Sequence, residues 1–177
     1  KFANTDEYRA ATNNKGIFNG IDAVVIATGN DWRAIEAGGH AYATKDGKYS
    51  GLTEWIFDEE KYILKGSLTL PMPVASVGGS IGLNPTVKAA FNILNNPDAK
   101  TLAGIIVSVG LAQNFAALKA LVSTGIQKGH MKLQARSLAL FAGAETEEVD
   151  IVVEKLLETN RINSENAKNI LKEIRNK

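Results

Sequence analysis

The longest apolar segment of the chain is LAGIIVSVGLAQNFAALKALVSTGI, residues 102–126. Its length raises the question of a membrane-spanning helix, which needs about 20 consecutive apolar residues. However, Gln113, Asn114 and Lys119 interrupt the segment, and such side chains are costly in hydrocarbon. We therefore expect a buried helix of a globular core. Within it, the neighbouring amides of Gln113 and Asn114 must find hydrogen-bond partners, either structural groups or a ligand.

Turn signals divide the N-terminal region. The Asn-Asn and Lys-Gly pairs of NNKG predict a loop at residues 13–16, after a short helix that ends near Arg9. The turn GND ends the apolar run IDAVVIAT, and Asn30 or Asp31 can cap the next helix, WRAIEAGGHAYAT. We expect that helix to stop at the turn KDG, residues 45–47.

The middle of the chain contains a strand pattern. Residues 51–73, GLTEWIFDEEKYILKGSLTLPMP, alternate apolar and polar types and are rich in aromatic and β-branched residues, with an acidic break at residues 58–60. This predicts an antiparallel hairpin, whose strands could join a larger sheet. Pro71 and Pro73 end the pairing, and the small, Gly-rich segment VASVGGSIGLNP predicts a loop.

From Pro85 onward the pattern is helical, and the last two helices are the clearest. Apolar residues recur at helical spacing over residues 149–157 and 167–174, with a turn at residues 159–163 between them. This predicts a two-helix hairpin over residues 147–177 whose apolar stripes face each other or a partner. Spacing alone allows an α/β or α+β domain. We interpret the fold class as α+β, mostly helical with a small antiparallel hairpin or sheet.

Composition excludes several classes of protein. With 177 residues the chain fits one domain, or one domain with an appendage. Lys and Arg number 20 against 19 Asp and Glu, so nothing favours nucleic acid or a membrane surface as the main partner. The absence of Cys excludes disulfides, thiolate metal sites and a cysteine nucleophile, and is compatible with a reducing, cytoplasmic location. The polar start KFANTDEYRA is unlike a signal peptide.

Two charged residues of the N-terminal region could act in catalysis. Lys15 could present its ammonium group to a developing oxyanion in a water-poor pocket, although local reasoning alone favours an ordinary exposed loop lysine. Asp31 could cap the helix that follows it. Alternatively, its carboxylate could hold a lysine ammonium in place and keep it protonated.

The two histidines differ in their surroundings. His40 lies among small residues in EAGGHAYA, which predicts a packed core histidine. His130 begins a helix at a Gly-marked break, in GIQKGHM, which suits either a mobile proton donor or a surface loop histidine. The loop SVGGS could let backbone approach a phosphate or nicotinamide closely, but it lacks the spacing of a nucleotide-binding fingerprint, so local reasoning favours a plain loop.

Three long segments carry a resemblance. They are YRAATNNKGIFNGIDAVVIATGNDWRAIEAGGHAYA, PMPVASVGGSIGLNP and VGLAQNFAALKALVSTGIQKGHMKLQAR. These segments closely resemble, in the same order, the C-terminal part of bacterial, class II hydroxymethylglutaryl-CoA reductase. That family reduces hydroxymethylglutaryl-CoA to mevalonate and CoA by two hydride transfers from NADH or NADPH, in the mevalonate (isoprenoid) pathway, and some members favour the reverse reaction.

The resemblance implies roles for individual residues. Lys15 resembles the catalytic lysine that stabilises the thioester oxyanion, and Asp31 the aspartate that hydrogen-bonds that lysine. His130 resembles the donor of a proton to the departing CoA thiolate. Further residues are implied in binding. They are Arg9, Asn19 and Gln113 for the substrate, and Val77, Gly78 and Gly79 for the nicotinamide cofactor; no residue is implied as a metal ligand.

The resemblance also implies domains and partners. Residues 1–126 resemble part of the large catalytic domain, and residues 127–177 a C-terminal helical flap that closes over a site at the interface of a homodimer or higher oligomer. The family's catalytic glutamate and nucleotide-binding domain lie upstream of the matched region, so we expect this polypeptide alone to be inactive. The alternative is a non-catalytic CoA-binding or dimerisation module.

Overall fold

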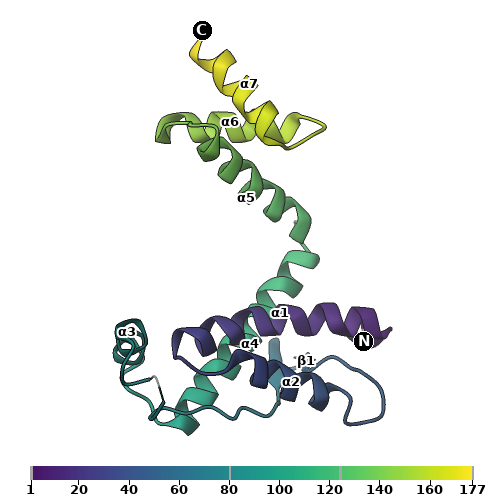
Figure 1. Ribbon diagram of the computed structural model, residues 1–177. Coiled ribbons are helices and arrows are strands. Elements are labelled where there is room, and N and C mark those ends of the chain that lie inside the picture. The colour runs from purple at the N-terminus through teal and green to yellow at the C-terminus, as the bar shows by residue number, and fades with distance from the viewer. Residues whose placement is uncertain (1, 80, 124, 177) are drawn as a thin grey trace. The chain divides into compact units, whose positions relative to one another are not determined.

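The computed structural model describes residues 2–79, 81–123 and 125–176 (Figure 1). Within them, helices dominate and two strands form one antiparallel sheet, so the predicted α+β class is confirmed. In chain order the elements are η1 (Phe2–Asn4), α1 (Glu7–Ala27), α2 (Trp32–Ala43), β1 (Thr53–Asp58), β2 (Ile63–Leu68), α3 (Pro85–Ile93), α4 (Ala99–Leu121), α5 (Ile126–Phe141), α6 (Thr146–Glu158) and α7 (Ser164–Arg175).

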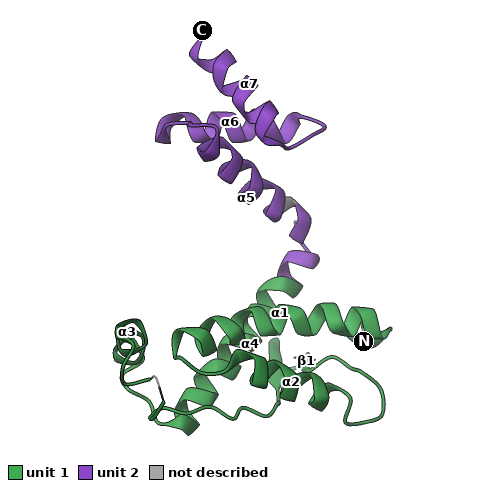
Figure 2. Cartoon of the chain, in the orientation of Figure 1, with its two compact units in different colours: residues 1–118 green, residues 119–177 purple. Residues whose placement is uncertain are grey.

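The chain divides into two compact units (Figure 2). Unit 1 comprises residues 1–118 and unit 2 residues 119–177. Each has its own hydrophobic core: the first is built from α1 to α4, and the second from α5 to α7. We describe each unit by itself.

The predicted loop at residues 13–16 is wrong, because these residues lie inside α1. The helix begins at the N-cap Asp6, whose side chain accepts a hydrogen bond from the backbone N–H of Arg9 at 2.9 Å. Tertiary packing overrides the turn-forming tendency of Asn and Gly in this segment. Asn14 is fully buried and Gly16 faces α4, so both residues serve contacts that a solvated loop would not need.

Glycines allow α1 and α4 to approach each other closely. A Cβ atom added at Gly20 would lie 2.9 Å from the carbonyl oxygen of Val109, and one at Gly110 would lie 2.7 Å from Cγ1 of Ile21. Ile21 is fully buried in the core of unit 1. At this crossing the backbone of each glycine therefore lies directly against the facing helix. The glycines are needed because a side chain would prevent this close approach, and not because they make the helices flexible.

Helix α4 is buried along one stripe only. Leu102, Ile106, Gly110 and Asn114 recur every four residues and are buried, whereas other residues of the helix are half-buried or exposed. By length and composition α4 is the described helix that could cross a membrane. The expectation of a buried core helix thus holds for one face, the face against α1.

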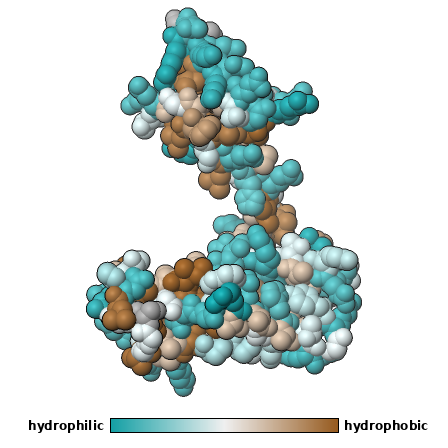
Figure 3. Space-filling model, viewed as in Figure 1, coloured by the Kyte–Doolittle hydropathy of each residue, from teal (hydrophilic) through white to brown (hydrophobic). Residues whose placement is uncertain are grey.

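The hairpin forms as predicted, with Trp55 opposite Gly66 in the register. The Trp55 ring covers Gly66, where a side chain would collide with it. Among the described residues the sheet has these two strands and no third. Its apolar residues Ile56, Phe57 and Leu64 are about half exposed. Apolar side chains also reach the surface elsewhere on both units (Figure 3).

Unit 2 is a three-helix assembly. The predicted hairpin is confirmed as α6 and α7, and their stripes pack on each other and on Ala135 and Ala139 of α5. Glu148 closes a capping box at the start of α6 and accepts two hydrogen bonds from Arg175, at 2.8 and 2.9 Å. The Arg175 bonds and the backbone N–H of Glu145 lower the pKa of Glu148 to about 2.

The helix crossing predicts opposite effects for two glycines. Gly20→Ala should destabilise the chain by about 1–3 kcal/mol, because the new methyl group collides with backbone of α4. Gly104→Ala, on α4 with nothing within 4 Å of its Cβ position, should instead stabilise by about 0.5–1 kcal/mol through helix propensity. Denaturant unfolding followed by circular dichroism measures both, and equal effects would contradict a close crossing.

Candidate active site

Lys15 and Asn19 lie one turn apart on the same face of α1, and both are exposed. The residue on each side of Lys15 is held inward, since Asn14 is fully buried and Gly16 faces Ala117. The Lys15 ammonium is thus carried by a rigid helical turn rather than by the loop predicted from the sequence. An exposed cation beside an exposed amide is suited to bind an oxygen-rich ligand.

Arg9 lies nearly three turns before Asn19 along α1 and is half-buried. Its guanidinium carbon stands 4.4 Å from the centroid of the Phe2 ring, in cation–π geometry. Its Nε atom is buried and has no hydrogen-bond partner among the described residues. Such a donor normally has a partner, so this guanidinium retains capacity to bind a carboxylate.

Asp31 caps α2. Its carboxylate accepts hydrogen bonds from the backbone N–H groups of Arg33 and Ala34, at 3.0 and 3.4 Å, and pairs with Nε of Arg33 at 3.2 Å. These bonds, that to the Arg33 side chain first, hold the pKa of Asp31 below its ordinary value. The capping interpretation is confirmed. In the described part of the chain there is no ion pair between Asp31 and Lys15.

Buried asparagines connect α1 to the hairpin and to α4. The Asn114 carboxamide oxygen accepts hydrogen bonds from Trp55 Nε1 at 2.9 Å and from the Thr53 hydroxyl at 3.0 Å. Its Nδ2 donates to Oδ1 of Asn13 at 2.9 Å. The expectation that the amide pair of α4 needs partners is therefore confirmed for Asn114, which is 1% exposed.

Asn14 makes a second set of bonds from the adjacent position. Its Nδ2 donates to the Tyr49 hydroxyl and the Ser50 carbonyl, and its Oδ1 accepts from the backbone N–H of Leu52. The Tyr49 hydroxyl in turn lies 2.8 Å from Nδ1 of His40, whose ring packs against Phe18. His40 is thus packed among other residues, as predicted, although it is half-buried rather than fully inside the core.

Gln113 is exposed, unlike its neighbour Asn114. Its Cβ lies 2.9 Å from the position that a Cβ of Gly20 would occupy, so its backbone is held against α1 beside Asn19. The structure therefore brings Gln113 and Asn19 to the same helix crossing in unit 1.

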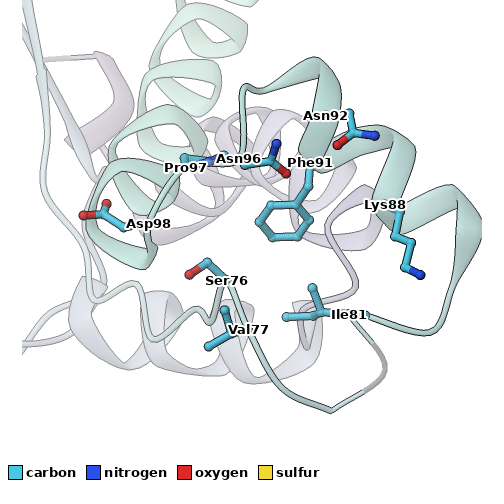
Figure 4. A pocket seen from close by; sticks show the side chains of 10 residues that line it. Ser76, Val77, Ile81, Lys88, Phe91, Asn92, Asn96, Pro97 and Asp98 are labelled. Carbon is cyan, nitrogen blue, oxygen red and sulfur yellow. The ribbon is translucent and has the colours of Figure 1, made fainter.

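The SVGGS loop borders a cavity of about 470 Å³ (Figure 4). The Phe91 ring points into it, toward Ser76, Val77 and Ile81, and Lys88 lies at its edge. Gly78 and Gly79 have φ angles of 89° and 53°, and no atom lies within 4 Å of where their Cβ atoms would be. Glycine is favoured here by conformation, and side chains of other segments leave this stretch of backbone open.

His130 belongs to unit 2, in the second turn of α5, and is exposed. The predicted glycine break lies at Gly125, which has a φ of 81° and is the N-cap residue. The expectation that the helix begins at His130 is wrong, because α5 already begins at Ile126. Within the residues that the structure describes, no three His, Asp or Glu side chains gather as they would around a metal ion.

Sequence reasoning missed a pair of acids, Asp22 on α1 and Glu36 on α2. Burial first, and then the charge and hydrogen bond of Glu36, raise the pKa of Asp22 from 3.8 to about 6. The Oδ1 atom of Asp22 is buried without a partner among the described residues. A carboxylate at the second position of the apolar run IDAVVIAT was the available signal.

Comparisons with known proteins give the family. Residues 1–135 match the family model described as hydroxymethylglutaryl-coenzyme A reductase. The chain belongs to this family, which confirms the resemblance of its motifs.

Individual relatives agree with this assignment. A 3-hydroxy-3-methylglutaryl-coenzyme A reductase of Archaeoglobus fulgidus is 49% identical over 174 residues, which are 98% of this chain and 39% of the relative. The solved reductase of Streptococcus pneumoniae is 64% identical with a TM-score of 0.69, over 98% of this chain and 41% of that one. A second structure of the class II enzyme from that organism, bound to NADPH in open conformations, has a TM-score of 0.68 at the same identity and covers 98% of this chain and 42% of that one. The chain thus spans about two-fifths of the length of these relatives.

The acid pair predicts a pH-dependent stability. Because the folded pKa of Asp22 is raised, its contribution is complete below about pH 4 and is lost as pH rises through about 6. Asp22→Asn mimics the protonated acid, so it should match the parent near pH 4 and unfold a few °C higher at pH 7.5, on the order of a 1 kcal/mol change. Thermal scans from pH 4 to 8 measure this. Glu59→Gln, in the exposed hairpin turn, is the control and should show no such difference between the two pH values.

Proposed function

We propose that this chain is part of a hydroxymethylglutaryl-CoA reductase, which interconverts hydroxymethylglutaryl-CoA with mevalonate and CoA by two hydride transfers with NADH or NADPH. The observation that carries the proposal is the family match over residues 1–135, which contains Lys15, Asp31 and His130. The geometry of unit 1 is consistent with it, since the implied substrate-binding side chains Arg9, Asn19 and Gln113 lie on α1 and α4, which pack together.

In this proposal Lys15 stabilises negative charge on the thioester oxygen. When hydride adds to the carbonyl carbon, the carbonyl oxygen becomes an oxyanion, and a fixed ammonium lowers the energy of that state. Asp31 is held ionised by Arg33 and backbone N–H groups, so its carboxylate can accept a hydrogen bond from the lysine and keep it protonated. In this structure the carboxylate binds Arg33, so the proposal requires it to bind Lys15 in the substrate complex.

His130 is proposed to protonate the departing CoA thiolate. An imidazolium is a stronger acid than a thiol, with ordinary pKa values of about 6.5 and 8.5, so the proton transfer is downhill. Protonated CoA cannot readily add back to the aldehyde. The position of His130 after the Gly125 break suits a group that moves toward the substrate.

Binding roles follow from the same residues. The Arg9 guanidinium, with a buried unpaired Nε, is proposed to bind the carboxylate end of the substrate, and the exposed amides of Asn19 and Gln113 its hydroxyl and carbonyl oxygens. The open backbone of Val77, Gly78 and Gly79 is proposed to lie against the nicotinamide ring, which supplies the hydride when bound.

Assembly and location are part of the same proposal. We propose a homodimer or higher oligomer with the site at the subunit interface, a cytoplasmic location, and a flap of residues 127–177 distinct from the large-domain residues 1–126. The compact units meet at residues 118 and 119, within α4, so the proposed flap lies wholly in unit 2. The second candidate function is a non-catalytic CoA-binding or dimerisation module; the chain spans about two-fifths of the length of its relatives.

Activity of the chain alone separates these two functions. We expect the purified 177-residue chain to show no mevalonate-dependent reduction of NAD or NADP, because the family's glutamate and nucleotide-binding domain are not among its residues. A polypeptide that joins this chain to the remaining sequence of the Streptococcus pneumoniae relative should be active. Absorbance at the nicotinamide band measures both, and turnover by the 177-residue chain would refute the expectation.

Lys15→Ala in that complete polypeptide tests the oxyanion role. Loss of the ammonium should lower kcat by at least about 10²-fold, the range for removal of an oxyanion-stabilising group. The circular dichroism spectrum should be unchanged, because Lys15 is exposed. Lys100→Ala, an exposed lysine at the start of α4, is the matched control and should retain full activity. Near-normal turnover by Lys15→Ala would remove Lys15 from the mechanism.

A further inference from the structure

Two of the proposed site residues, Lys15 and Gln113, lie within two positions of the residues of one hydrogen-bonded pair. Asn13 lies two positions before Lys15 on α1, and Asn114 directly follows Gln113 on α4. The two asparagines are joined by the 2.9 Å bond from Nδ2 of Asn114 to Oδ1 of Asn13. The bond thus connects the turn that carries Lys15 to the turn that carries Gln113.

Both asparagines of the pair make further hydrogen bonds to neighbouring residues. Asn114 accepts from Thr53 and Trp55, as described above, so its amide cannot rotate without losing both bonds. Nδ2 of Asn13 donates to the Thr53 hydroxyl at 3.3 Å and to Oδ1 of Asn14 at 3.4 Å. The orientation of each amide is therefore determined by donors and acceptors from α1, β1 and α4 together.

Because the network is buried, loss of one of its hydrogen bonds is costly. Asn114 is 1% exposed and Asn14 is fully buried, so water cannot replace a lost partner easily. Apolar residues at these positions would fill the space without needing hydrogen-bond partners, as Leu102 and Ile106 do along the same stripe of α4. An amide at position 114 in that stripe specifies a single register of α1 against α4, which an apolar contact would specify less sharply.

We propose that Asn13 and Asn114 are a positioning pair for the reductase reaction: their bond holds Lys15 and Gln113 at the separation that the thioester substrate requires. This inference rests on the proposed function. Neither asparagine touches substrate in this account. Each acts through its neighbour, by keeping two exposed polar groups on separate helices in fixed register.

The test uses the complete polypeptide that joins this chain to the remaining Streptococcus pneumoniae sequence. Asn114→Ala and Asn13→Ala should each lower kcat for hydroxymethylglutaryl-CoA by about 10–100-fold, since a displacement of ~1 Å can cost about 10²-fold. The KM should stay within about threefold. The double variant should be no worse than the poorer single variant, because both substitutions break the same bond.

Ile106→Ala is the matched control for lost stability. Ile106 is fully buried two turns before Asn114 on the same stripe of α4, and its truncation should cost about 2–5 kcal/mol without removing a polar bond. Assayed at a temperature where circular dichroism shows every variant folded, it should keep kcat within about twofold of the parent.

The outcomes are distinct. Full kcat in folded Asn114→Ala, additive losses in the double variant, or an equal loss in Ile106→Ala would each overturn the positioning pair while the parent's activity upheld the proposed function. An inactive parent would overturn the proposed function, and this inference with it.

Discussion

The crossing of α1 and α4 is the constraint on which unit 1 depends. Gly20 and Gly110 let the two helices approach until backbone and side chains are in direct contact, and the core residues Ile17 and Ile21 close over that contact. Every proposed substrate-binding residue lies on one of these two helices. Gly20 directly follows Asn19, and a side chain at Gly20 would collide with Cβ of Gln113, so glycine at this position keeps Asn19 and Gln113 close to each other.

Secondary-structure elements that depend on a local sequence pattern were predictable from the sequence. The cap at Asp31, the hairpin around residues 58–60 and the two C-terminal helices follow from local rules that need no knowledge of distant residues. The loop predicted around Lys15 was wrong because the conformation of this segment depends on distant residues. Asn and Gly favour turns locally, but Asn14 is stabilised in the helix by partners more than 30 residues away, which local rules do not include.

For the site residues too, local sequence predicted some features, and others depend on contacts between distant residues. Local reasoning could place Asp31 at a helix start but could not decide between a cap and a catalytic carboxylate, because both use the same side chain. Local chemistry offered Lys15, Asp31 and His130 as possible site residues, and only the resemblance of the motifs assigned them to one reaction. The Asp22 and Glu36 pair escaped notice because its raised pKa arises from the packing of α1 on α2, which sequence spacing does not reveal.

The hydrogen bonds of the buried asparagines also limit which substitutions the chain can accept. Asn14 and Asn114 bind groups on the segments around residues 13, 49–52 and 53–55, so a substitution in one segment changes what the others must supply. The side chains on these segments therefore depend on one another for hydrogen bonds although they are far apart in sequence. Recombination that exchanged α4 between distant relatives without the hairpin and the first half of α1 would separate donors from their acceptors in a buried place.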